Sequence, residues 1–295
     1  MMKLTFISQW GGTLDLVNND LFTLTNVDGM TTAATDISSI VIGGIDGDHI
    51  NNIQAQPRGI VFDLRIKNGV NVESAKRAVL SIVKLKQNCT LQWTQNNRTL
   101  TIQGVVDTVT MPRFSNEVTM QISIHCGEPF WEDLNEIISE ISQIIGLHYF
   151  TSDPYGMLYF TPEGRPLSAY DISRTRIFNN SGDVAVGMTI EILAFDTVTN
   201  PIIYGQNGTF FGVGYGSKSL TMSAGDTLII NTKAGEKSVT LFENGSTDGV
   251  SQLDKVKPRS TWLQLQAGEN EFSIDSDDAS TDNMIFTLAY RQRYI

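Results

Sequence analysis

The sequence predicts a mainly β protein, in which an α+β first domain with one helix is followed by a β-sandwich. In residues 1–133, segments of alternating apolar and polar residues recur, and the clearest is Arg58–Lys67. A single segment, from Val72 to Leu85, has its apolar residues close to the helical period of about 3.6. After residue 150, about ten short apolar segments alternate with Gly, Asn and Asp, which is typical of a sandwich.

Within the first domain, short strands are expected around Leu4–Phe6, Leu14–Leu16 and Leu21–Leu24. Residues 25–47 are rich in Thr, Ser, Gly and Asp, with one apolar run at Ile37–Ile42 and a loop at 43–48. A helix is predicted over Asn71–Gln87, with Asn71 as its N-cap. The polar triplet at 95–97 predicts a hairpin turn, and strands continue from it to residue 126.

A short linker helix is predicted over residues 134–150, between a first domain at 1–133 and a second at 151–295. Asp133 and Glu136 resemble a capping box, and Gly146 stands where a helix would end. We expect the apolar stripe of this helix to contact a domain or a neighbouring subunit, so Ile138→Asp or Ile141→Asp should impair folding or assembly. The candidate subunit-interface residues are Leu134, Ile137, Ile138, Ile141, Ile144 and Ile145.

Composition restricts the classes of partner. The net charge is −11, and neither half of the chain has the basic excess that binding to phosphates requires, so no specific nucleic-acid binding is expected. DNA could still pass through a lumen built from such a chain. No apolar run is long enough to span a bilayer, and no signal peptide is recognised, so we expect synthesis in a cytoplasm without membrane insertion. The two cysteines, Cys89 and Cys126, are expected to be buried or half-buried thiols.

No residue pattern predicts an enzyme, a cofactor or a metal. The histidines, at 49, 125 and 148, have no second ligand at a suitable spacing. The Asp46–Asp48 segment fails the calcium-loop pattern, and Gly212–Ser217 is expected to form a hairpin or a bulge rather than hold phosphate. Two alternatives stay open. A glycosidase would use paired carboxylates such as Glu191 and those of 275–278, and a carbohydrate- or receptor-binding sandwich would use Tyr204, Tyr215 and Trp262.

The order of several short motifs carries a resemblance. Asp46-Gly47, the strand opening at Arg58-Gly59-Ile60, the helix and the segment 98–106 are followed by Cys126-Gly127-Glu128-Pro129-Phe130-Trp131. Looser matches follow at 178–183, 200–201, 225–232 and 260–270. In this order the chain resembles the distal tail proteins of long-tailed phages, a family of tail-tip and baseplate ring proteins.

The resemblance implies a structural virion protein without catalytic residues. It implies a first domain that assembles into a homo-hexameric ring and a galectin-like second domain that projects from it. Such a ring would join the tail tube protein to the tail-tip hub protein, with the tape measure protein and receptor-binding proteins as further partners. The implied location is the distal end of the virion tail, after synthesis in the bacterial host cytoplasm.

Overall fold

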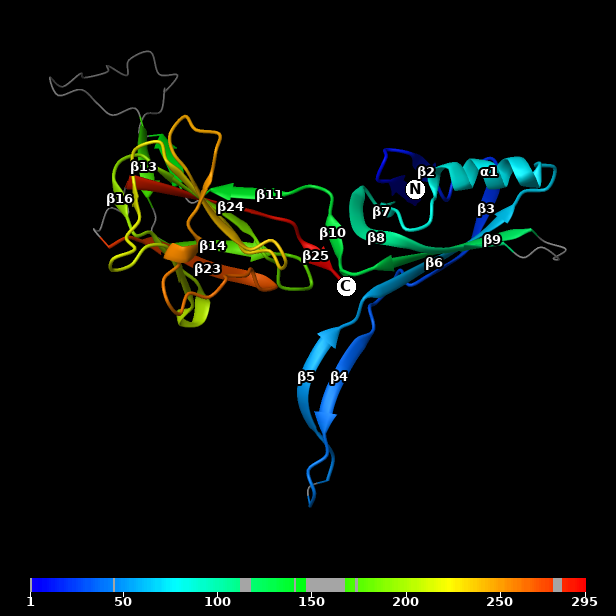
Figure 1. The fold of residues 1–295 in the computed structure, drawn as a ribbon, viewed down its shortest axis with the longest axis horizontal. Coiled ribbons are helices and arrows are strands. Elements are labelled where there is room, and N and C mark those ends of the chain that lie inside the picture. Colours follow the sequence, from blue (N-terminus) through cyan, green and yellow to red (C-terminus); the bar gives the residue numbers. More distant parts are fainter. Residues whose placement is uncertain are drawn as a thin grey trace, which may run out of the picture. The chain divides into compact units, whose positions relative to one another are not determined.

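The computed structural model describes residues 2–44, 46–111, 118–140, 142–146, 168–172, 175–277 and 283–295, with the backbone alone for 140, 142–146 and 168–172. These residues form two compact units (Figure 1). The first unit consists of Met1–Asn135 and Arg293–Ile295, and the second of Glu136–Gln292. In sequence, the second unit is therefore an insertion near the end of the first. The domain boundary predicted between residues 150 and 151 falls outside the described residues.

One antiparallel sheet of nine strands forms the frame of the first unit. Its main path is β2-β1-β7-β8-β9-β6-β3, and β10 pairs with both β8 and β25. The long strand β8 holds β7, β9 and β10 together, so the sheet depends on it. The nine strands are β1 (Lys3–Ser8), β2 (Thr13–Asp15), β3 (Phe22–Asp28), β6 (Arg58–Ile66), β7 (Asn88–Gln95), β8 (Arg98–Thr110), β9 (Thr119–Cys126), β10 (Trp131–Asp133) and β25 (Arg293–Tyr294).

The predicted helix is confirmed as α1 (Val72–Ile82), which lies along the sheet (Figure 1). The side chain of Asn71 caps it by accepting a hydrogen bond from the backbone N–H of Ser74 at 3.0 Å. The helix ends at Ile82 rather than Gln87, because Val83 is already extended and Lys86 has φ 62°. Ala75 and Val79 are buried, so the helix covers the core of the first unit with one face.

The segment after β3 forms a long two-stranded hairpin, which we call the arm (residues 35–55). It consists of β4 (Thr35–Ile40) and β5 (His49–Ala55), which pair only with each other among the described strands. The arm extends away from the sheet of the first unit (Figure 1). Every described residue from 35 to 54 is exposed. The sequence predicted an apolar run and a loop here, but not a projecting hairpin.

The second unit is a sandwich of two main sheets that share one core. The larger sheet has the order β11-β24-β15-β20-β21-β22 and the smaller β14-β23-β17-β18. Phe178 joins them, with its ring 5.9 Å from Phe272 and 6.4 Å from Phe286, both edge-on. The mainly β prediction is therefore confirmed. The larger sheet contains β11 (Ile137–Glu140), β24 (Met284–Tyr290), β15 (Thr189–Ala194), β20 (Thr227–Asn231), β21 (Ser238–Phe242) and β22 (Val250–Ser251).

The smaller sheet and the connecting elements are short. The four strands of that sheet are β14 (Thr175–Asn180), β23 (Gly268–Asp275), β17 (Ile202–Tyr204) and β18 (Phe210–Gly212). Two further strand pairs are β12 (Ser142–Gly146) with β13 (Ser168–Ile172), and β16 (Val198–Thr199) with β19 (Thr221–Met222). The 3-10 turns are η1 (Gln206–Gly208) and η2 (Leu253–Lys255). Within the described residues no helix combines the length and apolar character needed to cross a bilayer.

The predicted linker helix at 134–150 is wrong. Ile137–Glu140 forms β11, which pairs with β24, and Ser142–Gly146 forms β12. Asp133 does not cap a helix, because it lies in β10 and pairs with Arg98 at 3.3 Å. Gly146 is a strand residue rather than a helix terminus. Pairing with a strand 150 residues further along the chain overrides the local helical pattern, as tertiary context often does.

Candidate functional site

The arm presents an apolar surface with no partner among the described residues. Its exposed apolar side chains are Ile37 (56%), Ile40 (56%), Val41 (78%), Ile42 (47%), Ile50 (50%) and Ile53 (62%). Ile37 and Ile40 lie three residues apart in β4, so they point to opposite faces of the hairpin. Ile37 and Ile53 are direct cross-strand partners. Both faces of the arm are therefore apolar and open.

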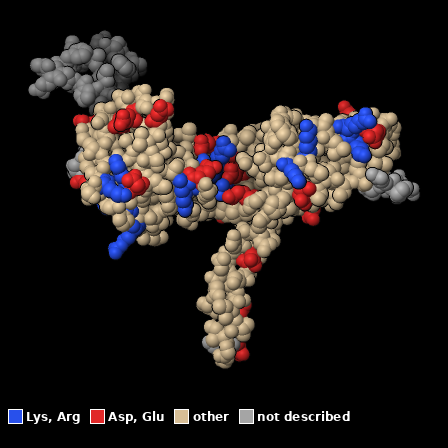
Figure 2. Space-filling view, in the orientation of Figure 1, with Lys and Arg blue, Asp and Glu red and all other residues tan. Residues whose placement is uncertain are grey.

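The arm carries negative formal charge only, apart from the neutral His49. Residues 35–55 contain three aspartates and no lysine or arginine. In Figure 2 the arm shows no Lys or Arg, in contrast to the body of the first unit, where basic and acidic side chains are interspersed. Because an isolated two-stranded hairpin is marginally stable in water, an apolar one of this length requires a covering partner.

Arg58, the first residue of β6, anchors the segment that connects β3 to the arm. This side chain is 3% exposed, and its Nη1 atom donates to the carbonyl oxygens of Met30 at 3.2 Å and Thr31 at 3.1 Å. Its Nε and Nη2 atoms have no hydrogen-bond partner among the described residues. Burial lowers the pKa of the guanidinium. Gly29 (φ 79°) lies in the same connecting segment, and a Cβ on it would meet the carbonyl oxygen of Gly59 at 2.0 Å.

The strand beside the arm is an open edge. β3 is the last strand on its side of the sheet, paired with β6 alone. A β-bulge between Leu24 and Asn26 interrupts its register with β6. Its outer backbone groups have no strand partner among the described residues, and such edges readily accept a strand from another chain. The arm and the edge are successive segments of one chain, so a single neighbour could cover both.

The six predicted interface residues do not form one face. Ile137 packs against the core of the second unit, whereas Ile138 is 67% exposed on the other face of β11 and Leu134 is 45% exposed. Ile141 lies outside the described residues, as do the side chains of Ile144 and Ile145. Their role as subunit contacts stays a prediction, and the exposure of Ile138 shows only that its side chain is not buried within the chain itself.

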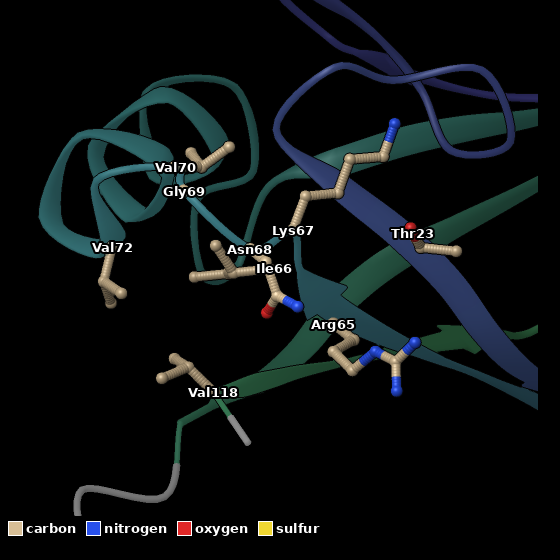
Figure 3. Close-up of a pocket in the computed structure, with 9 residues that line it drawn as sticks. All are labelled: Thr23, Arg65, Ile66, Lys67, Asn68, Gly69, Val70, Val72 and Val118. Carbon is tan, nitrogen blue, oxygen red and sulfur yellow. The ribbon is translucent and has the colours of Figure 1, made fainter. Parts of the chain in front are cut away.

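A hollow of about 400 Å³ lies at the end of β6 near the start of α1 (Figure 3). Figure 3 shows Val72 and Val118 on one side, while the Arg65 and Lys67 side chains point away from them. The hollow contains no acidic residue among its lining residues, and Arg65, Lys67 and Asn68 are all exposed. It is a shallow surface groove with a basic rim rather than an enclosed active site.

The residues considered for catalysis are not brought together. His125 is exposed and the adjacent Cys126 is buried, on opposite faces of β9 as predicted. Burial raises the pKa of Cys89 to about 12 and that of Cys126 to about 11. Such thiols stay protonated near neutral pH and are poor nucleophiles. His148 lies outside the described residues, and among those described no three His, Cys, Asp or Glu side chains are grouped to hold a metal ion.

The carboxylates considered for glycosidase chemistry have other surroundings. Asp277 accepts a hydrogen bond from the Asn200 amide at 2.7 Å, and Asn200 in turn accepts from the backbone N–H of Leu220 at 2.8 Å. Glu191 is exposed on β15. Asp278 lies outside the described residues. The predicted hairpin at 212–217 is confirmed, since Tyr215 and Lys218 pair across it.

Comparison with known proteins gives a family match to part of the chain, most of it in the second unit. Residues 181–294 match the family model of the siphovirus-type tail component, C-terminal domain. No curated protein matches the chain. The crystal structure of the SPP1 phage Dit protein, described as a paradigm of the hub adsorption apparatus in phages infecting Gram-positive bacteria, has a TM-score of 0.66 at 13% identity and covers 99% of each chain.

A phage P2 baseplate structure, in its activated conformation with calcium, has a TM-score of 0.47 at 11% identity over 99% of this chain and 98% of that one. The resemblance to distal tail proteins is thus confirmed, by sequence over residues 181–294 and by the shared fold with SPP1 Dit over nearly the whole chain.

Proposed function

We propose that this chain, whose residues 181–294 carry a siphovirus-type tail component C-terminal domain, is a structural ring subunit at the distal end of a phage tail. Six copies would close a ring through their first units. The ring would join the tail tube protein to the tail-tip hub protein, near the tape measure protein. The second unit would project as a platform for receptor-binding proteins. No catalytic step is part of this role.

The arm is the observation that carries this proposal. Each apolar side chain of this size that becomes fully buried contributes roughly 1.5–3 kcal/mol. The arm holds six such side chains on two open faces, with an open strand edge beside it. In a ring, each subunit meets its neighbour through two different surfaces, and the arm supplies one of them. The complementary surface would lie on the next copy of the chain.

The charge of the chain supports a position in a DNA conduit. Its net charge is −11, and the arm has no lysine or arginine. An acidic lumen repels the phosphate backbone, so DNA would pass without binding. Assembly in the host cytoplasm and residence in the virion follow from this role.

The mass of the assembled chain tests the proposal. A ring of six chains of 32.6 kDa has a mass of about 196 kDa, measured by mass photometry of the purified chain or of the chain with its tail tube protein. We expect Ile53→Asp to weaken assembly at least tenfold, since it places an unpaired charge in the proposed contact. Because Ile53 is 62% exposed, the fold should be unchanged.

Ile177→Asp is the matched control, because Ile177 is 64% exposed on β14 of the second unit and lies outside the arm. It should assemble like the unmodified chain. A chain that stays monomeric alone and with tube and hub proteins would refute the ring. Equal assembly of the two variants would show that the arm is not the contact.

A further inference from the structure

Two adjoining hollows lie on the second unit around η1. The first, of about 350 Å³, is lined by residues of the η1 turn, the segment 261–266 and β23. The second, of about 370 Å³, shares Gly205, Gln206 and Asn207 with the first and adds Tyr204, Glu271 and Ser273. The two hollows share the η1 turn as one wall, and we call them together the amide groove. Its volume is within the range of small-molecule sites.

The lining of the groove is polar but almost uncharged. None of the residues that line the first hollow is ionisable, and Glu271 is the one ionisable carboxylate lining the second. Trp262 and Tyr204 supply aromatic surface, one in each hollow. Five of the lining residues carry side-chain amides, namely Gln206, Asn207, Gln264, Gln266 and Asn270.

The wall of the groove is rigid. The Gln206 amide donates to the carbonyl oxygen of Glu269 at 2.8 Å, and the Thr209 hydroxyl donates to that of Gln206 at 2.7 Å. Asn270, 1% exposed, accepts from the backbone N–H of Gln266 at 2.7 Å and donates to its carbonyl oxygen at 2.8 Å. The Trp262 ring packs 4.8 Å from that of Phe211. The groove is therefore preformed, which lowers the entropic cost of binding.

Three side-chain amides on this wall are available to hydrogen-bond a ligand. Asn207, Gln264 and Gln266 are exposed, and their side chains have no hydrogen-bond partner among the described residues. An amide side chain both donates and accepts, as does a sugar hydroxyl, so the two match in pairs. Aromatic residues beside such amides offer apolar surface to the C–H face of a sugar ring.

We propose that the amide groove binds a neutral saccharide. Phosphate or carboxylate ligands lack a partner here, because no lining residue is basic and Glu271 repels anions. Lys237 lies near the groove, but its Nζ atom is 5.5 Å above the Trp262 ring. Tyr215, the third aromatic residue singled out in the sequence, lines neither hollow. The site is independent of ring formation, which requires only the first unit.

Saturation-transfer NMR on the full chain tests the site, with glucose, galactose and N-acetylglucosamine as probes and inorganic phosphate as the anionic comparator. At least one saccharide should bind with a roughly millimolar Kd, as expected for a small polar ligand. Phosphate should not bind. Gln264→Ala and Asn207→Gly should each weaken binding about threefold to tenfold. Glycine is chosen at 207 because the backbone there has φ 57°.

Gln103→Ala is the control, since Gln103 is an exposed glutamine on β8 that lines neither hollow. It should bind like the unmodified chain, and circular dichroism should show all three variants folded. If no probe binds the folded chain, if phosphate binds instead, or if all variants keep full affinity, the proposal fails. None of these outcomes depends on the mass of the assembly, so the ring and the groove are judged separately.

Discussion

Gly104 illustrates how one missing side chain shapes the first core. It faces Cys89 across the β7–β8 pair, and a Cβ on it would meet the Sγ atom of Cys126 at 2.9 Å. Cys89 and Cys126 are 4% and 0% exposed, and the Cys89 thiol donates to the carbonyl oxygen of Gly104 at 3.4 Å. The predicted buried thiols are thus confirmed, and they act as packing groups on either side of a glycine.

The two thiols should make the first unit sensitive to high pH. Burial disfavours the thiolate and raises their pKa values from 9.0, the value of an unperturbed thiol, to about 12 and about 11 in the folded chain. The unfolded chain therefore loses protons first as the pH rises above about 9, and stability falls from there up to about pH 12. Urea unfolding at pH 8 and pH 10.5 should show this loss, with a smaller one in the Cys89→Ala, Cys126→Ala double variant.

Thiol titration with Ellman's reagent provides the matching check at pH 8. Both cysteines should be unreactive in the folded chain and react fully in urea. Rapid reaction without denaturant would contradict the burial of both groups.

Elements with local signals were predictable from the sequence, and elements defined by distant partners were not. The start of α1 was found because its N-cap and its buried Ala75 and Val79 lie within one short segment. The turn between β7 and β8 was found because Asn96 and Asn97 both tolerate the positive φ that they adopt, 49° and 67°. Such signals need no knowledge of the rest of the chain.

The structure of the segment 134–146 could not be predicted from local signals in this way. Its isoleucines fit a helical stripe and a strand about equally well, and β-branched residues favour strands only when a partner is present. The partner is β24, from residue 284 onward. The arm was missed for a related reason, because exposed and buried isoleucines look alike in a sequence. The amide groove joins residues near 205 with residues near 264, so no local motif could predict it.

The alternation along β11 gives a direct test of the corrected structure. Ile137→Asp should destabilise the second unit by about 2–3 kcal/mol, because Ile137 packs against its core. Ile138→Asp should leave stability within about 0.5 kcal/mol, because Ile138 is 67% exposed. Thermal unfolding of both variants distinguishes strand from helix, since a helix buried along its stripe would make both substitutions costly.

The chain crosses between its two units twice, at residues 135–136 and 292–293. Both crossings end in paired strands of the first unit, since β10 and β25 are antiparallel neighbours. Arg293 is held by Glu132 at 2.6 Å, and the Tyr294 hydroxyl donates to Asp133 at 3.0 Å. The last residues of the chain are therefore part of the first core, and a complete first unit forms only after the second has been synthesised.

Tyr294 should consequently contribute to the stability of the first unit, whose residues outside 293–295 all precede residue 136. Its ring is 9% exposed, and the Arg98 guanidinium lies 3.6 Å from the ring centroid. We expect Tyr294→Ala to destabilise the first unit by about 3 kcal/mol, from lost burial and the lost cation–π contact. Hydrogen exchange should accelerate in β8 and β10 but not in β15 or β20 of the second unit. Ile295→Ala, at a residue 50% exposed, is the control and should change neither. Unchanged exchange in β10 of the Tyr294 variant would show that the chain end does not hold the first unit together.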